Sequence, residues 1–242
     1  MHFFTLTRIE VSPLAGIFIK QAKRFSIEKT LRIFPVAREG FPFILAAILC
    51  IIIAWFLGLA WAEYVLVPAA VFIIAFFRDP ERRIPEDRGS IVSPADGRVI
   101  RIERLKQNGL IRADAIKISI FMNLFNVHVN RIPYAGRVKE IIYRPGKFFN
   151  ADLDKASEFN EQNALVMEDE SGRRFAFVQI AGLIARRIVC RARQGMAFKK
   201  GERFGLIRFG SRLDVYLPET CRLNVKVGDK VKAGNSIVGY WP

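Results

Sequence analysis

An uncharged apolar run covers residues 41–62 and restricts the folds open to this chain more than any other feature. A helix needs roughly 20 apolar residues to cross the hydrocarbon core of a bilayer, and this run reaches that length. Glu63 ends the run, and a second apolar stretch with Pro68 inside it follows at 64–77. The pattern predicts a helical membrane hairpin over 41–77. A helix buried in a protein core is the alternative.

Charged segments flank the predicted hairpin on both sides. Residues 1–40 carry seven Lys and Arg against three Asp and Glu, and residues 78–88 carry four of each. Basic flanks favour the cytoplasm, so we expect both ends of the hairpin on the cytoplasmic face. Within the basic N-terminal segment 1–40, residues 14–34 mix apolar and basic side chains, as in an amphipathic helix lying on an anionic membrane. A frayed basic tail is the alternative.

The whole chain is strongly basic, with a formal net charge of +15 over 242 residues. Residues 89–242 contribute most of this excess, because they carry 27 Lys and Arg against 15 Asp and Glu. A basic surface favours an anionic partner. Hydrophobic residues make up 51% of the chain, which is high for a nucleic-acid binder. We therefore expect an anionic membrane and no nucleic acid as the partner. The sequence leaves open whether the chain forms a homo-oligomer.

Residues 78–242 have the pattern of a β-rich domain. Ile116, Ile118 and Ile120 alternate with polar neighbours, which is typical of a half-buried strand. The same reasoning predicts further strands at 125–132, 136–143, 163–168, 174–181, 187–193 and 206–216.

Turn signals complete this pattern. Asp96-Gly97 between short apolar runs indicates a hairpin, and the polar stretch 148–161 indicates a loop with a helical turn. Residues 223–240 predict three short strands separated by a Gly-Asp turn and an Ala-Gly turn. The predicted fold class is mainly β (α+β): a sandwich of hairpins resembling biotinyl or lipoyl carrier folds, preceded by the apolar helical hairpin.

Several functions of such a sandwich lack the residues they need. A carrier domain would present a lysine on a Met-Lys-Met type hairpin tip, and none occurs. A zinc peptidase needs several His and Asp ligands, but His128 is the only histidine of this domain. The three cysteines are far apart and form no CxxC pair, so we predict no metal site. A membrane-tethered adaptor without chemistry remains as an alternative.

The dipeptide Gly210-Ser211 suggests a different chemistry. A serine hydroxyl can attack the carbonyl of the preceding residue, and a glycine there removes side-chain bulk from the strained backbone. The amide becomes an ester, β-elimination cuts the chain, and loss of ammonia leaves a pyruvoyl group at residue 211. Such a group forms a Schiff base with a substrate amine and then withdraws electrons, as pyridoxal phosphate does.

The segments around this dipeptide make the suggestion specific. They are FFRDPER (76–82), SPADGRV (93–99), NVHVNRIP (126–133), ARRIV (185–189) and KGERFGLIRFGSRLDVYLP (200–218). In this order, over residues 40–242, the chain resembles the phosphatidylserine decarboxylases in their short bacterial form.

The resemblance implies a self-cleaving proenzyme. Cleavage between Gly210 and Ser211 would give a large chain, 1–210, and a small chain, 211–242, with the pyruvoyl cofactor made from Ser211. The implied reaction converts the phospholipid phosphatidylserine to phosphatidylethanolamine and CO₂. The implied location is the bacterial inner membrane, with the catalytic domain, 78–242, on the cytoplasmic face.

Two more residues receive roles from the resemblance, and one position departs from it. His128 is expected to transfer protons, and Asp96 to orient the base that activates Ser211 for self-cleavage. Longer family members have a second histidine three residues after the first, and Arg131 stands at that position here.

Arg208 and Arg212 flank the predicted cleavage site. Strand alternation would place both on the face opposite Ser211. We expect them to be structural or surface residues rather than phosphate ligands.

Overall fold

The computed structural model describes residues 35–149, 159–183, 187–208 and 210–242. The predicted amphipathic segment 14–34 and the greater part of the predicted loop 148–161 lie outside the described residues.

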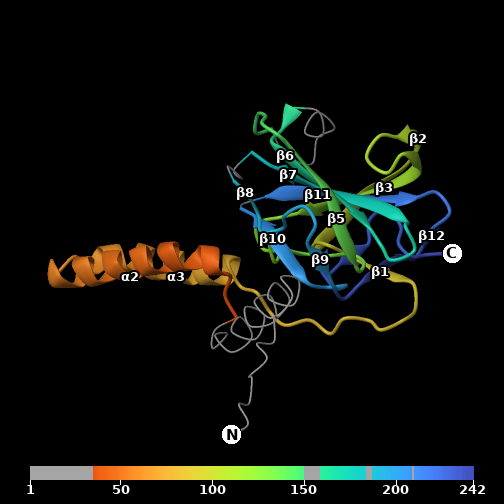
Figure 1. The fold of residues 1–242 in the computed structure, drawn as a ribbon. Helices are drawn as coiled ribbons and strands as arrows, with labels where there is room; N and C mark the ends of the chain where they lie inside the picture. The colour runs from red at the N-terminus through yellow and green to blue at the C-terminus, as the bar shows by residue number, and fades with distance from the viewer. Residues whose placement is uncertain (1–34, 150–158, 184–186, 209) are drawn as a thin grey trace, which may run out of the picture.

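Two apolar helices project side by side from a β-rich body (Figure 1). After a short 3-10 turn, η1 (Arg38–Gly40), helix α2 spans Phe41–Phe56 and helix α3 spans Ala60–Phe76. Gly58 turns the chain between them with a φ of +66°, a conformation that glycine adopts without steric cost. The predicted helical hairpin is therefore present.

Backbone hydrogen bonds close the hairpin at its base. The Ala37 N–H donates to the Phe77 carbonyl at 2.7 Å, and the Asp79 N–H donates to the Pro35 carbonyl at 2.6 Å. The segments that enter and leave the hairpin are thereby held together against the body.

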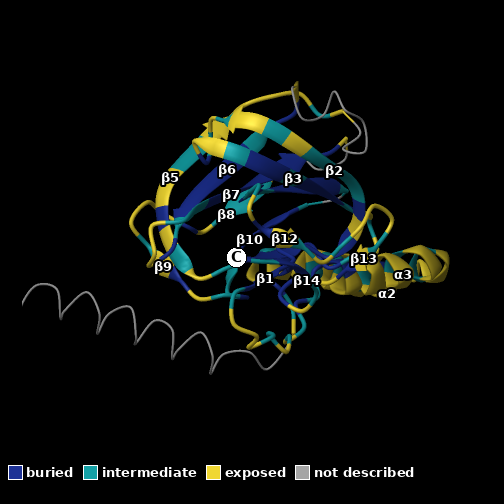
Figure 2. Cartoon of the chain, turned by 90° about the vertical axis from the view of Figure 1, so that its right-hand side faces the viewer, coloured by how far each residue is buried: buried dark blue, intermediate teal, exposed yellow. Residues whose placement is uncertain are grey.

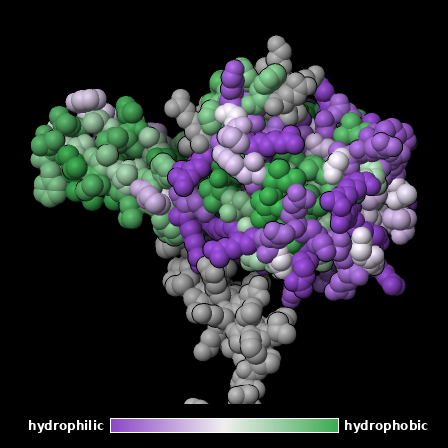
Figure 3. Space-filling view, turned by 45° about the horizontal axis from the view of Figure 1, so that its top comes forward, coloured by the Kyte–Doolittle hydropathy of each residue, from purple (hydrophilic) through white to green (hydrophobic). Residues whose placement is uncertain are grey.

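The side chains of the hairpin are mostly exposed, as the yellow helices of Figure 2 and the green rod of Figure 3 show. Tyr64 is 83% exposed and Phe56 75%, and Ala54 is the one buried residue of α2. The 19 residues Arg38–Phe56 are apolar enough and long enough to cross a membrane, while α3 is shorter. An apolar surface of this extent is typical of contact with lipid or another protein.

The body contains one large antiparallel sheet, in the order β13-β2-β3-β11-β7-β6-β5-β9. Its central strands β6, β7 and β11 are buried along nearly their whole length, whereas β2 and β5 also carry exposed residues. Their bounds are β2 (Gly97–Asn108), β3 (Ala113–Met122), β5 (Gly136–Arg144), β6 (Gln162–Glu168), β7 (Arg174–Ala181), β9 (Ala197–Phe198), β11 (Ser211–Pro218) and β13 (Lys230–Val231).

Two three-stranded sheets lie against the inner face of the large one, which arches over them in Figure 2. Their orders are β1-β14-β12 and β4-β10-β8. Their bounds are β1 (Ser90–Val92), β4 (Val129–Arg131), β8 (Ile188–Cys190), β10 (Arg203–Ile207), β12 (Arg222–Leu223) and β14 (Ile237–Tyr240).

The main core fills the space between these sheets. The large sheet contributes Ile118, Leu213 and Phe177, while Ile91 comes from one small sheet and Phe204 from the other. All five side chains are fully buried. The mainly β fold class with a preceding helical pair is thus confirmed.

Two predicted strands are shorter than expected. The strand expected at 125–132 is reduced to β4, because residues 123–126 form a turn in which the Asn126 N–H donates to the Asn123 carbonyl. The strand expected at 187–193 is reduced to β8.

The predictions at 206–216 and at Asp96-Gly97 are wrong in their connections. The chain leaves β10 at Ile207 and starts β11 only at Ser211, in a different sheet. Asp96-Gly97 joins no hairpin, because β1 pairs with β14 while β2 pairs with β3 and β13. In both places the strands pair with partners that are distant in the sequence, and burial against those partners determines the connection.

Candidate active site

The step between Gly210 and Ser211 lies where the chain passes from the β4-β10-β8 sheet to the large sheet. Gly210 has a φ of +60°, in the left-handed region that disfavours every residue with a Cβ. A Cβ added there would meet nothing within 4 Å. The glycine therefore serves the backbone conformation and not close packing.

Ser211 is the first residue of β11 and is fully buried. It lies opposite Met122 of β3 and Ala181 of β7, so the large sheet holds its backbone on both sides. Its hydroxyl has no hydrogen-bond partner among the described residues. A buried polar group left unbonded is costly, and such groups mark strained or reactive positions.

His128 lies between β3 and β4, next to the end of β10. Its backbone carbonyl accepts the Ile207 N–H at 3.4 Å. Its ring is 2% exposed and packs against Phe76, the last residue of α3, with 4.3 Å between ring centroids. The site thus lies at the base of the apolar hairpin.

The electrostatic environment of His128 keeps its ring neutral. Burial, above all, lowers its pKa from 6.5 to about 4, and the nearby Arg78 lowers it further, against a hydrogen bond to the Asn126 carbonyl. That bond joins Nδ1 to the carbonyl oxygen at 2.9 Å. Because a carbonyl only accepts, Nδ1 carries the proton. Nε2 is then a free proton acceptor, and it has no partner among the described residues.

A buried series of amides borders the serine and was not found from the sequence. The side-chain amide of Asn163 donates to Oε1 of Gln179 at 3.1 Å, and Nε2 of Gln179 donates to Oδ1 of Asn130 at 2.9 Å. Asn130 in turn donates to the sulfur of Met122 at 3.7 Å, a weak acceptor. Because Met122 lies opposite Ser211, the amide series ends beside the serine. The one signal in the sequence was a glutamine within the apolar strand FAFVQIA.

Asp96 lies at the same end of the large sheet as Ser211. Arg98 of β2 and Arg212 of β11 both pair with Phe121 of β3, so two strand spacings, about 10 Å, separate the two sites. Both carboxylate oxygens of Asp96 are engaged, one by the Ala233 N–H at 2.7 Å and the other by Arg82 at 2.8 Å. In the uncut chain Asp96 is not bonded to His128.

Arg131, at the position of the second histidine, binds the linker that follows α3. Its guanidinium donates to the Pro80 carbonyl at 2.9 Å and the Gly201 carbonyl at 3.0 Å, and it lies 3.5 Å from the Asp79 carboxylate. Arg203 reaches the same carboxylate at 2.8 Å. Burial is the main reason that the pKa of Arg131 falls to about 10. Arg131 therefore anchors the linker.

The two arginines beside the cleavage site do not share a face. Arg212 is fully buried and forms a bidentate ion pair with Asp214, with both distances 2.7 Å. Arg208 lies outside any strand, with its guanidinium 5.1 Å from the Phe43 ring centroid of α2. The prediction of a common face is wrong because the strand ends before Arg208.

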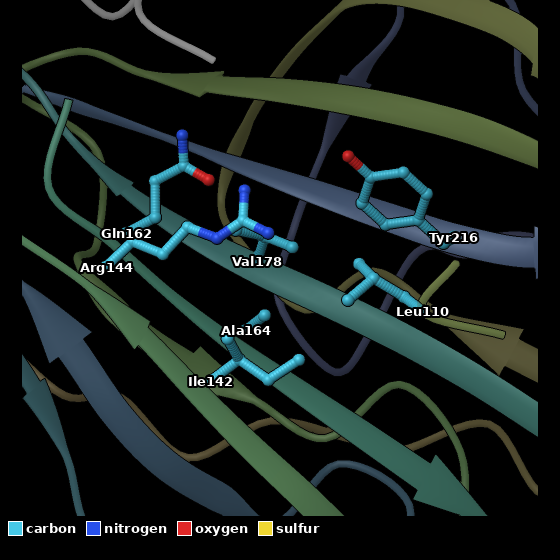
Figure 4. A pocket seen from close by; sticks show the side chains of 7 residues that line it. All are labelled: Leu110, Ile142, Arg144, Gln162, Ala164, Val178 and Tyr216. Atoms are coloured by element: carbon cyan, nitrogen blue, oxygen red, sulfur yellow. The ribbon is translucent and has the colours of Figure 1, made fainter. Parts of the chain in front are cut away.

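A cavity of about 160 Å³ lies against the large sheet (Figure 4). Tyr216 lines it, and Ser211 is five residues earlier in β11, so its side chain is on the opposite face. Arg144, Gln162 and Tyr216 provide the polar side chains of the cavity. Burial raises the pKa of Tyr216, so the phenol stays protonated near neutral pH. Within the described part of the chain, no group of His, Cys, Asp and Glu has the arrangement of a metal site.

Comparison with known proteins places these residues in one family. The family model described as phosphatidylserine decarboxylase matches residues 69–239. A relative from Desulfotalea psychrophila, named phosphatidylserine decarboxylase proenzyme, is 50% identical over 85% of this chain and 96% of its own length. Proteins of the same name from Syntrophus aciditrophicus and Ralstonia nicotianae are 52% and 50% identical over 84% and 82% of this chain, and over 96% and 92% of their own lengths. The chain therefore belongs to the phosphatidylserine decarboxylase family and is an enzyme of this kind.

Proposed function

We propose that the chain cuts its own backbone between Gly210 and Ser211, and that the pyruvoyl group formed from Ser211 serves the conversion of phosphatidylserine to phosphatidylethanolamine. One observation carries the proposal. Ser211 has a buried hydroxyl that no described residue hydrogen-bonds, directly after a glycine with a φ of +60°. The relatives are named proenzymes, which agrees with processing into a large chain, 1–210, and a small chain, 211–242.

Self-cleavage requires only residues of this chain and water. The Ser211 oxygen bonds to the Gly210 carbonyl carbon while the C–N bond breaks, so that the amide becomes an ester and the nitrogen of residue 211 becomes an amine. Loss of the α-proton of Ser211 then expels Gly210 as a carboxylate. Water replaces the nitrogen, which leaves as ammonia, and residue 211 becomes the pyruvoyl group. That group supplies an electron sink for the loss of CO₂.

The residues present fit this group. The large sheet fixes the backbone of residue 211 through pairs on both sides, opposite Met122 and Ala181. Arg212 directly follows and is immobilised by its buried ion pair with Asp214. The pairs of Arg212 to Pro218 with β3 and the ion pair of Arg212 do not involve the peptide bond before Ser211, so they remain after the cut and hold the new terminus in place.

His128 is the proposed proton-transfer residue. Its Nε2 is unprotonated because Nδ1 donates to the Asn126 carbonyl, and a pKa of about 4 keeps the ring neutral at pH 7. A neutral imidazole can accept the proton that the Ser211 hydroxyl loses. The Asn126 carbonyl fixes the tautomer, a task that an aspartate performs in Ser-His-Asp triads.

The role of Asp96 in self-cleavage stays a prediction. The variant Asp96→Asn tests it, because it keeps the size of the side chain and the bond from Ala233 but loses the ion pair with Arg82. An uncut chain would support the role. A normally cut chain would limit Asp96 to holding the linker.

We further propose the division 1–40, 41–77 and 78–242, with 41–77 as the membrane hairpin and the catalytic domain on the cytoplasmic face of the bacterial inner membrane. Support comes from the many exposed apolar side chains of α2 and α3, a surface suited to contact with lipid. The packing of Phe76 on His128 also brings the site to the end of the hairpin, where a lipid headgroup would lie.

Denaturing electrophoresis and intact mass test the cleavage. Protein purified from membranes should run as two pieces, the smaller covering 211–242 with a blocked N-terminus, while Ser211→Ala should stay whole and inactive. Ser119→Ala is the matched control, since Ser119 is also buried with an unbonded hydroxyl but pairs with Asp214 on the other face. An uncut wild-type chain without a pyruvoyl group would refute the proposal.

The variant His128→Ala separates the two proton-transfer steps. A chain that stays whole places His128 in self-cleavage, whereas a cut but inactive chain places it in decarboxylation. A cut and fully active chain would remove His128 from both.

A further inference from the structure

Arginines gather where the apolar hairpin joins the body, and most of them have protein partners. Arg78 donates to the Ala75 and Phe125 carbonyls, both at 2.6 Å. Arg191 forms a bidentate ion pair with Glu39 at 2.6 and 2.8 Å. These two residues hold the ends of the hairpin on the body.

Arg187 and Arg208 differ from these, because neither guanidinium forms an ion pair or a hydrogen bond within the described residues. Arg187 is exposed, and Arg208 is half-buried with its Nε fully buried and unbonded. A buried donor of a charged group without an acceptor is unfavourable, and an anionic ligand would relieve the cost.

The backbone places the two arginines directly opposite each other. The Arg208 N–H donates to the Arg187 carbonyl at 3.3 Å, which extends the pairing of β10 with β8 beyond Ile207 and Ile188. Opposite residues of antiparallel strands project to the same side, and like charges in such a pair repel. The pKa of Arg208 is accordingly lowered, first by burial and then by the charge of Arg187.

Arg208 contacts the apolar helices and lies close to the serine along the chain. Arg208 is three residues before Ser211, and its guanidinium lies over the Phe43 ring of α2. Phe43 stacks on Phe77 at the end of α3, with 5.4 Å between ring centroids. Figure 3 shows hydrophilic side chains on the body next to the apolar rod. In a phospholipid the phosphate lies between the acyl chains and the head amine, the same order as hairpin, arginine pair and Ser211.

We propose that Arg187 and Arg208 bind the phosphate of the lipid headgroup and so position its amine at residue 211. Two guanidinium groups side by side suit a phosphate, which accepts bidentate hydrogen bonds. The expectation that Arg208 is only structural rested on one strand running over 206–216. β10 instead ends at Ile207, and a single further backbone hydrogen bond holds Arg208 beside Arg187. The inference rests on the proposed function, because it requires phosphatidylserine to react at residue 211.

The carboxylate that self-cleavage leaves on Gly210 is a second anion with similar chemistry, two residues from Arg208. The substrate phosphate and the Gly210 carboxylate predict different effects when the arginines are replaced. A phosphate ligand makes them matter for substrate use by the cut enzyme. A Gly210 carboxylate ligand makes them matter for the cutting itself.

The experiment compares wild type, Arg187→Gln, Arg208→Gln and the control Arg104→Gln, all as full chains in detergent micelles containing phosphatidylserine. Arg104 of β2 is exposed and pairs with Glu219. Electrophoresis measures the cut fraction, and decarboxylation rates are divided by it. We expect normal cutting and a kcat/KM lowered roughly 10- to 100-fold for the first two variants, and close to wild type for the control. The ratio of kcat/KM for phosphatidylserine to that for a phosphate-free lipid, joined to the serine oxygen through a carbamate so that the amine and carboxylate stay free, should fall by the same factor.

Three outcomes would overturn the inference. One is an unchanged kcat/KM in both variants, and another is an equal loss with the phosphate-free lipid. The third is slowed cutting with a normal kcat/KM of the cut enzyme, which assigns the arginines to the Gly210 carboxylate. Failure of the proposed function would look different, because wild type itself would stay uncut or fail to release CO₂.

Discussion

Acidification should destabilise the uncut protein through His128 alone by a measurable amount. The ring is 2% exposed, and its pKa in the folded chain is about 4 instead of 6.5. The unfolded chain therefore binds one proton more than the folded chain between these two pH values. Above pH 6.5 His128 does not reduce the free energy of unfolding. Below that pH the free energy of unfolding decreases by about 1.4 kcal/mol for each unit of acidification, to a total loss of about 3 kcal/mol near pH 4.

The assay compares two uncut proteins, Ser211→Ala with and without His128→Phe, in denaturant titrations at pH 7 and pH 4. Phenylalanine keeps the aromatic packing on Phe76 but cannot take up a proton. Trp241, which is 7% exposed in the body, reports unfolding when Trp55 and Trp61 of the hairpin are replaced by Phe. Other titrating groups are common to both proteins and cancel.

The protein that retains His128 should lose about 3 kcal/mol more between pH 7 and pH 4 than the one with phenylalanine. Equal losses in the two proteins would show that the ring is hydrated in the folded state. That result would refute both its burial against α3 and its assignment as a neutral base.

Three further substitutions test the backbone conformation, ion pairs and strand pairing around the site. Gly210→Ala should cost about 1 kcal/mol in stability, because its φ of +60° disfavours a Cβ, and should slow self-cleavage on a gel time course; unchanged kinetics would show that this conformation is dispensable. Asp79→Asn should lower the stability of the uncut chain by roughly 3 kcal/mol, since the buried Arg131 would lose the carboxylate beside it and Arg203 would keep only the exposed Glu81; an unchanged unfolding midpoint would contradict this. Gly205→Ala would bring a Cβ within 2.1 Å of a β8 carbonyl oxygen, so β8 should separate from β10 and the purified chain should remain uncut; normal cutting would show that β8 is not needed.

Periodicity predicted the elements of this protein better than their connections. The helical hairpin over 41–77 and the strands at 136–143, 163–168 and 174–181 agree with the structure within a few residues. Each of these depends on a local alternation of apolar and polar side chains, which the sequence displays directly. The break after Ile207 depends on which sheet each half joins, and no local pattern encodes that choice.

The same distinction applies to the site. Ser211 and His128 stood out because their residue types and neighbours are distinctive within the sequence. The amide series that ends at Asn130, and the packing of His128 on Phe76, join residues from distant segments. The sequence showed only that Arg131 stands where longer family members have a second histidine. Its contact with Asp79, which anchors the linker after α3, depends on the fold.

The central position of β11 has a consequence for the two chains that a cut at Gly210 would create. β11 pairs with β3 on one side and β7 on the other, β13 forms one edge of the same large sheet, and β12 and β14 belong to the β1-β14-β12 sheet. A small chain whose strands belong to these two sheets cannot dissociate unless both sheets open. Subunit exchange between mature molecules should therefore be absent under native conditions. A separately expressed 211–242 peptide should likewise fail to restore a truncated large chain, so a catalytically dead molecule can be replaced only by new synthesis.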